Sequence, residues 1–499
     1  MSQVIAFKPT AYPGLSEEPA IAILRKFQIQ LILLILCSLA VHFLFFGDYY
    51  YTFDDSYVLH VYGRNLAEGH GFSFNPGEIS HAATPLLSFV LAAQHFLFGD
   101  GALMTGKVVN LLFSLGAGLL LFLIAYRLTN SSVIAFGSAA VWLLSPLESI
   151  LSAGPQDFAM FTFLILLSLY WYLFHPQSLL TYFFLSLVIL ARYEGALYAG
   201  LMFLNHLMME HRSKSISGKT IALRILLLSL LPAIWFGYIG THATLLPTSG
   251  SAKLNLWAIR KIPHLLAGLA IFFMFPLVLA AAMLAFSRIM EKSPQLLFLF
   301  IWVSFCLCFY GPFLDNRRYY IHLLPFLALF ALVSLRSACQ KVVPSGKSPA
   351  ALMSAAVVFS FLVYLCTIPY FYNLTRGNGH ANTYEAYKQA GLWIRDHTSE
   401  SATFASEEIG VIPYFAHRRL VDFSGWLDLQ SKQFREKADG MNAPMISYLQ
   451  TKRPDYIVIN TDFVSPPHQE LLSGDSRFSL VQKVPLLEHD ALLIYSCRW

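Results

Sequence analysis

The sequence predicts an α-helical membrane protein with many spans, followed by a small soluble α/β domain. Of its 499 residues, 56% are hydrophobic and only 13% are charged, and the mean hydropathy is +0.55. A soluble globular chain is about one-quarter charged, so most of this chain must be dissolved in lipid. The apolar character ends near residue 373, where shorter apolar runs and more frequent charges begin.

Apolar runs long enough to cross a bilayer recur through residues 1–372. A helix needs about 20 apolar residues to span the hydrocarbon core, and about eleven runs qualify. They lie near residues 27–47, 107–126, 132–150, 158–174, 178–193, 194–210, 221–241, 264–286, 295–312, 319–335 and 350–371. One further run, residues 83–98, is short and ends in a Gly-Asp turn.

The basic loops decide whether the run 83–98 crosses the membrane. If it does not cross and the N-terminus is cytoplasmic, the cytoplasmic loops carry the Lys and Arg residues, as the positive-inside rule requires, with the loop near His175 as the exception. If it crosses, every later basic loop faces outward. We therefore predict an interfacial or re-entrant helix at 83–98 and an external C-terminus. The deciding residues are Lys8, Arg25, Lys26, Arg127, Arg212, Lys214, Lys219, Arg288, Lys292, Arg336, Lys341 and Lys347.

The segment 373–499 reads as a small external α/β domain, because helical and strand patterns alternate along it. It contains no glycine-rich phosphate loop and no nucleotide fingerprint. Helices are predicted over Tyr384–His397 and 442–451, and strands over Ala402–Ser406, Leu420–Phe423, Tyr456–Asn460, Phe478–Val484 and Leu492–Tyr495.

The first external segment, residues 48–106, carries the strongest functional signal. Asp54 and Asp55 follow directly on the first apolar run, and ionisable residues beside hydrocarbon are functional candidates by default. The alternative is a solvated loop that merely ends a helix. Further polar residues favour a site: Asn65, Glu68, His70, Asn75, Glu78 and His81.

The predicted topology gathers other polar residues on the same external face. Basic residues can hold a phosphate there, and a carboxylate can accept a proton from a hydroxyl. These residues are Glu148, Asp157, Arg192, Glu194, Lys253, Asp315, Arg317 and Arg318.

Each of these residues also has a structural interpretation. Arg192 and Glu194 could pair with each other and hold two spans together. Arg317 and Arg318 could anchor a helix end, and Lys253 could snorkel to the interface. His70, His81 and His242 could ligate a divalent ion with Asp or Glu, but their spacing is not diagnostic, and a hydrogen-bonding role is favoured. The six cysteines give no disulfide framework.

Several stretches resemble a known family. Asp54-Asp55-Ser56-Tyr57 and the residues through Glu78 resemble the first external loop of GT-C fold membrane glycosyltransferases. The most similar branch contains the mycobacterial arabinofuranosyltransferases, and the aminoarabinose and protein O-mannosyl transferases are more distant. The resemblance recurs at Leu190-Ala191-Arg192-Tyr193-Glu194-Gly195, Leu246-Pro247-Thr248 with Lys253, Arg317-Arg318-Tyr319 with Pro325, and Ile409-Gly410 through Asp422-Phe423-Ser424-Gly425.

The resemblance implies an inverting sugar transfer from a polyprenyl-phosphate donor to an external glycan, lipid or protein acceptor. The general base is then Asp54 or Asp55, and Asp54 is favoured because it matches the leading acid of the family's pair. Lys253, Arg317 and Arg318 are the candidates for binding the donor phosphate. No cofactor is certain, although a divalent metal ion could take part. The substrate-binding candidates are Asn65, His70, Glu78, His81, Asp157, Arg192 and Glu194.

The same resemblance places the protein in a bacterial cytoplasmic membrane, with the lipid bilayer as a partner. The net charge of +5 does not indicate nucleic-acid binding, because the Lys and Arg residues lie in short loops between apolar runs, where they set the topology. Two stretches depart from the family's pattern. Gly154-Pro155-Gln156-Asp157 stands where the branch usually has Gly-x-Glu-Thr, and Gly311-Pro312 with a displaced Asp315 stands where Gly-Gly-Asp is common. Both departures bear on which sugar or acceptor the protein uses.

Two other functions compete with the transferase. A transporter or flippase of a polar lipid-linked sugar would place its ionisable residues near the bilayer midplane and often shows inverted repeats. Here the polar residues gather at one interface and no repeat is evident. A non-catalytic relative that binds envelope glycans is a third reading, which the intact Asp54, Asp55 and Lys253 argue against.

Overall fold

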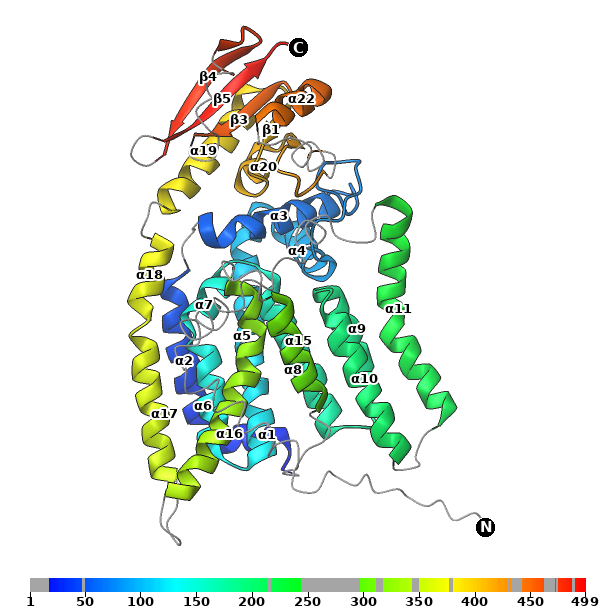
Figure 1. The fold of residues 1–499 in the computed structure, drawn as a ribbon, viewed down its shortest axis with the longest axis vertical. Helices are drawn as coiled ribbons and strands as arrows, with labels where there is room; N and C mark the ends of the chain where they lie inside the picture. Colours follow the sequence, from blue (N-terminus) through cyan, green and yellow to red (C-terminus); the bar gives the residue numbers. More distant parts are fainter. Residues whose placement is uncertain are drawn as a thin grey trace.

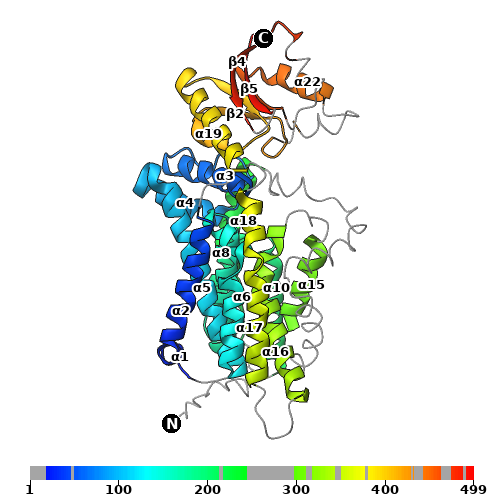
Figure 2. The ribbon, with the colours of Figure 1, turned by 90° about the vertical axis from the view of Figure 1, so that its left-hand side faces the viewer.

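The structure, a computed structural model, consists of a bundle of long helices with a small α/β domain at one end (Figure 1). The helix α1 lies at the end of the bundle farthest from the sheet in both views (Figures 1 and 2). The structure describes residues 18–46, 50–212, 217–243, 297–310, 317–342, 350–376, 380–428, 431, 442–461, 472, 474–486 and 490–499. Lys253, Asp315 and the predicted span 264–286 lie outside these residues.

Most of the predicted apolar runs form helices within the described residues. Four helices there are long and apolar enough to cross a membrane, or up to six if each of two bent pairs counts as one span. The predicted number of about eleven spans therefore stays a prediction. The bundle contains α1 (Ala20–Lys26), α2 (Gln28–Leu44), α5 (Ala102–Thr129), α6 (Ser132–Leu143), α7 (Pro146–Ala153), α8 (Asp157–Phe174), α9 (Leu180–Ala191), α10 (Gly195–Arg212), α11 (Gly218–His242), α15 (Leu297–Tyr310), α16 (Leu324–Val342), α17 (Ala350–Leu365) and α18 (Ile368–Arg376).

The run 132–150 is not the single helix that its hydropathy predicted. It forms α6 and α7, which are bent by 50° at Ser145-Pro146. A proline disfavours helical backbone at the residue before it, yet it suits the first position of a new helix. Ser145 caps that new helix, because its hydroxyl accepts the backbone N–H of Glu148 at 3.2 Å. The break brings a short helix to the end of the bundle nearer the α/β domain (Figure 1).

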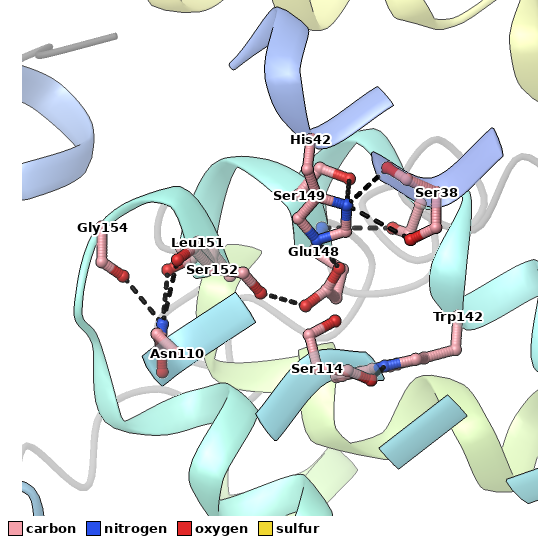
Figure 3. A network of polar contacts seen from close by, with 11 residues as sticks. Ser38, His42, Asn110, Ser114, Trp142, Glu148, Ser149, Leu151, Ser152 and Gly154 are labelled. Atoms are coloured by element: carbon pink, nitrogen blue, oxygen red, sulfur yellow. Dashed lines mark hydrogen bonds and ion pairs between the residues drawn. The ribbon is translucent and has the colours of Figure 1, made fainter. Parts of the chain in front are cut away.

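A buried polar network fixes α7 against α2 and α5 (Figure 3). Glu148 of α7 lies 3.0 Å from Nε2 of His42 on α2, and both side chains are 2% exposed. His42 Nδ1 lies 2.8 Å from the carbonyl oxygen of Ser38 one turn earlier. The amide of Asn110 on α5 donates to the carbonyl of Gly154 at 2.9 Å and to those of Leu151 and Ser152 at 3.3 Å. The last carbonyls of a helix have no partner within it, and Asn110 supplies a donor to them; the Gly154 carbonyl also accepts the backbone N–H of Gln156.

Replacing Asn110 with alanine is expected to destabilise the bundle by about 1–3 kcal/mol, because buried carbonyls lose their donor. Thermal unfolding of the purified protein in detergent measures this change. Ser114→Ala is the matched control on the same helix, because the buried Ser114 hydroxyl has no hydrogen-bond partner in the described part of the chain. Equal loss in both variants would contradict the capping role.

Two helices, α3 (Tyr50–Ala67) and α4 (Pro85–Phe98), lie across the end of the bundle beneath the α/β domain (Figures 1 and 2). They pack closely at Gly63, where an added Cβ would lie 2.9 Å from Cβ of Leu91. Phe96, Leu97 and Phe98 at the end of α4 are exposed. Their position suits an interfacial helix whose tip meets lipid, as predicted for 83–98. Asp54 and Asp55 lie in the helix α3, not in an open loop.

The C-terminal domain has the predicted strands and helices. Its sheet has the order β2-β1-β3-β5-β4, in which β2, β1 and β3 are parallel and β5 and β4 are antiparallel to their neighbours. The short helix α20 was not predicted, and it packs on α3. The elements are α19 (His380–His397), β1 (Thr403–Ser406), α20 (Val411–Ala416), β2 (Arg419–Asp422), α22 (Asn442–Lys452), β3 (Tyr456–Asn460), β4 (Phe478–Pro485) and β5 (Ala491–Cys497). The boundary predicted at residue 373 stays a prediction.

Candidate active site

The two adjacent aspartates of α3 have different surroundings. The Asp55 carboxylate is half exposed, and its Oδ2 lies 2.5 Å from Nη1 of Arg318. Arg318 belongs to η5 (Arg317–Leu323), the 3₁₀ turn that leads into α16, and its side chain is 20% exposed. An Arg–carboxylate pair at a partly open site offers an ionised acid and a cation side by side. This pair can accept a proton and bind an anion.

Asp54 faces the C-terminal domain instead. Its Oδ1 is buried and has no hydrogen-bond partner among the described residues. Gly410 lies so close that an added Cβ would overlap Oδ1 and come within 2.9 Å of Cγ. Burial and the neighbouring carboxyl of Glu408, a hydrogen-bonding partner, raise the pKa of Asp54 well above its ordinary value. The two neighbouring acids therefore differ in their exposure and in the groups that they contact.

Arg192 joins three helices at the same end of the bundle. It follows α9 and donates to Asp157 Oδ1 at the start of α8 and to Glu194 Oε1 just before α10, each at 2.5 Å. All three side chains are between 11% and 14% exposed. The charge of Asp157 also acts on Arg318, which links this cluster to the Asp55 pair. The pairing of Arg192 with Glu194 is confirmed; Asp157 is a partner that the sequence did not predict.

Replacing Arg192 with methionine is expected to destabilise the protein by about 3–5 kcal/mol, because two buried carboxylates lose their counter-ion. The triple variant Arg192→Met/Asp157→Asn/Glu194→Gln removes the charges together and should recover most of the loss. Thermal unfolding in detergent compares the two. A single variant as stable as the wild type would contradict this prediction.

Two predicted substrate-binding residues have structural partners. The buried Asn65 amide donates to the carbonyls of Ser73 and Phe74 at 2.9 and 2.7 Å, which shapes the turn after α3. Glu78 forms an ion pair with Arg419 of β2. These contacts account for Asn65 and Glu78 without a substrate, and their binding role remains a prediction.

The three histidines considered for a metal are engaged separately. His81 is buried and hydrogen-bonds the Tyr193 hydroxyl. His70 is exposed beside Glu68 at 3.7 Å, and His242 Nδ1 lies 2.8 Å from the Tyr238 carbonyl. Across the residues that the structure describes, no group of three His, Cys, Asp or Glu residues could hold a metal ion. The Arg317 side chain, like Lys253, lies outside the described part.

The contacts between α3 and the C-terminal domain were missed by sequence reasoning. The hydroxyls of Tyr57 and Tyr384 lie 2.9 Å apart, and Arg64 donates to the Tyr414 carbonyl at 2.8 Å. Asn75 exchanges two 3.0 Å hydrogen bonds with the backbone of Leu420. The Ile409-Gly410 stretch was noticed as a motif, but nothing in it pointed to Asp54. These pairs could not be predicted because their members lie far apart along the chain.

Comparisons with known proteins agree with this architecture. The chain matches ArnT from Cupriavidus metallidurans in the apo state with a TM-score of 0.61 at 13% identity, covering 94% of this chain and 98% of that one. The same protein bound to undecaprenyl phosphate matches with a TM-score of 0.59, also at 13% identity and with the same coverage. An oligosaccharyltransferase from Archaeoglobus fulgidus, tethered to an acceptor peptide, matches with a TM-score of 0.56 at 11% identity, covering 88% of this chain and 69% of that one.

These matches define the class of fold. The chain has the fold shared by ArnT and the archaeal oligosaccharyltransferase, so the predicted GT-C fold is confirmed. Residues 374–495 match a family described as a domain of unknown function (DUF8728). No curated protein matches the sequence. The arabinofuranosyltransferase branch therefore stays a prediction.

Proposed function

We propose that this protein is a membrane glycosyltransferase that moves a sugar from a polyprenyl-phosphate donor to an acceptor hydroxyl or amide at the external face of a bacterial cytoplasmic membrane. The observation that carries the proposal is the Asp55–Arg318 pair, a partly exposed carboxylate against a guanidinium at the domain junction. It lies in a fold shared with ArnT, a protein also seen with undecaprenyl phosphate. That lipid product would be an anion that Arg318 can bind.

The proposed step uses Asp55 as the general base. Asp55 removes the proton from the acceptor nucleophile as that atom bonds to the anomeric carbon. The bond from the anomeric carbon to the phosphate oxygen breaks, and its electron pair leaves with the polyprenyl phosphate. Because a phosphate is a good leaving group when cations stabilise it, no general acid is required. An in-line attack with the base and the leaving group on opposite sides inverts the anomeric centre.

Arg318 is proposed to bind the donor phosphate, with Lys253 and Arg317 as further candidates. A guanidinium can bind phosphate through two hydrogen bonds. In the structure Arg318 is held by Asp55, so the incoming phosphate competes with that carboxylate. Donor binding would then release Asp55 from Arg318 so that it can contact the acceptor. The donor would therefore bind before the acceptor.

The sequence favoured Asp54 as the base, and the surroundings of the two acids now favour Asp55. Oδ1 of Asp54 is buried against Gly410, where an acceptor has little access to it, and the pKa of Asp54 is raised well above its ordinary value by burial and by Glu408. Asp55 is exposed and lies against the Arg318 guanidinium, so an acceptor can reach it beside a group that can bind the donor phosphate. Asp54 is then left with a different task.

A donor panel tests the proposal. The protein in detergent is incubated with polyprenyl-phosphate pentoses and hexoses and with an extract of the cell envelope as acceptor. We expect one donor to release polyprenyl phosphate and to label the extract. The arabinofuranosyltransferase-like branch predicts that this donor carries a pentose. Absence of release with every donor would contradict the transferase and favour movement of an intact lipid-linked sugar.

A further inference from the structure

The junction between α3 and the C-terminal domain brings two carboxyl groups together at Gly410, which touches Asp54 and donates its backbone N–H to Glu408. Asp54 comes from α3, and Glu408 comes from the turn between β1 and α20. Glu408 is 4% exposed, and Oδ1 of Asp54 is buried. Two ionised carboxylates cannot remain in contact away from water, because their repulsion adds to the desolvation of both charges. One proton must therefore be held between them.

The two carboxyl groups differ in the hydrogen bonds that they receive. Oε1 of Glu408 accepts the backbone N–H of Gly410 at 3.0 Å and that of Val411 at 2.8 Å. Two N–H donors stabilise a carboxylate. Oδ1 of Asp54 has no such donor among the described residues and lies against Gly410. An oxygen in that position is tolerated far better in a neutral acid than in an anion.

Building on the proposed function, we propose that Glu408 is a positioning residue of the transfer site, which shares one proton with Asp54. The neutral Asp54 and the anionic Glu408 hold the C-terminal domain on α3. Asp55 is then the single ionised carboxylate of the aspartate pair. The C-terminal domain thereby sets the charge of the site without touching the reacting atoms.

Other groups around Asp54 set the pH range of this pairing. Asp55 on the same helix raises the pKa of Asp54 further, and Arg318 on η5 lowers it. From α19 the Tyr384 hydroxyl contacts that of Tyr57, and from α4 His95 contacts His60, with the ring nitrogens 3.0 Å apart. Neither is a cause of the Asp54 shift. The raised pKa means that the docked state binds the extra proton.

The sign of the pH dependence follows from that proton. The docked domain is favoured at pH values below the ordinary Asp pKa of about 4 and up to the raised pKa, and it is lost as the pH rises through the raised value. Above that value two carboxylates would face each other, so the domain would lift from α3. A purely structural contact would have no such dependence.

Infrared spectroscopy of the full-length protein in lipid nanodiscs tests the proposal without any substrate. We expect the wild type to show a carboxylic-acid carbonyl band at neutral pH that is absent in Asp54→Asn. In Glu408→Gln the amide still accepts both backbone N–H groups but carries no charge. The Asp54 band should then disappear at a pH lower by about one unit or more.

Two more variants make the result decisive. Glu407→Gln, which changes the neighbouring acid, should leave the titration of the band unchanged. If Glu408→Gln does not fold, Gly410→Ala reports on the same pair, because its Cβ forces Asp54 and the turn apart and should also move the band to lower pH. A wild type without the band at neutral pH, or a band that titrates in both Glu408→Gln and Gly410→Ala as it does in the wild type, overturns the proposal. Because the infrared measurement needs no turnover, its result can be interpreted even if the transferase assay fails.

Discussion

Asp55→Asn is expected to slow sugar transfer by roughly 10²- to 10⁴-fold in kcat, the usual contribution of a positioned general base. Asparagine keeps the size of the side chain and can still bond Arg318, but it cannot take the acceptor's proton. The donor should therefore bind the variant about as well as the wild type. Single-turnover release of polyprenyl phosphate, measured with the donor that the panel identifies, gives the rate.

The comparison with Asp54→Asn decides which acid is the base. If Asp54 is neutral in the docked enzyme, asparagine mimics its uncharged form and the loss of rate should be smaller than in Asp55→Asn. Asp396→Asn, at an exposed acid on α19 far along the chain from the site, serves as the control for a lost surface charge. A larger loss in Asp54→Asn than in Asp55→Asn would contradict this account and return the role to Asp54.

Arg318→Ala is expected to weaken binding of polyprenyl phosphate by roughly 10- to 100-fold. A hydrogen bond to a charged group contributes about 1.5–3 kcal/mol, and each 1.4 kcal/mol is a factor of ten in affinity. The affinity of Arg318→Lys should lie between those of the alanine variant and the wild type, because lysine keeps the charge but cannot form bidentate hydrogen bonds to the phosphate. Isothermal titration with polyprenyl phosphate in detergent measures the Kd directly.

Loss of folding is not the expected cause of that weakening. The Asp55 carboxylate is 53% exposed, so water can solvate it when Arg318 is removed, and exposed pairs contribute little to stability. Arg336→Ala is the matched control, because Arg336 lies near the other end of α16 and donates to the Thr129 carbonyl at 2.9 Å. Equal affinity in Arg318→Ala and Arg336→Ala would exclude Arg318 from the phosphate site.

Local patterns predicted the elements well. The apolar run that begins at residue 158 forms α8 almost as predicted, and β3 has the predicted bounds Tyr456–Asn460. Both succeed because hydropathy and strand propensity act over neighbouring residues. Ser145-Pro146, a capping serine before a proline, is a signal for a helix break. The break was nevertheless not predicted, because the apolar run continues through these residues.

Pairs that are distant along the chain could not be predicted in the same way. Arg192 and Glu194 were paired in advance because they are two positions apart, whereas Asp157 reaches Arg192 only through the packing of α8 against α9. Glu408 reaches Asp54 through the placement of a whole domain on α3. A single sequence does not show how one domain packs against a distant helix. The sequence identified the two acids, but the different surroundings of Asp54 and Asp55 could not be predicted from it.

The most direct test of the central claim separates transfer from lipid movement. The protein is reconstituted in proteoliposomes with the active donor and with acceptor on one side, and the donor lipid is then analysed. The transferase predicts that polyprenyl phosphate appears while the sugar moves to the acceptor, and that both stop in Asp55→Asn. Intact lipid-linked sugar that changes leaflet without release of polyprenyl phosphate would contradict the account.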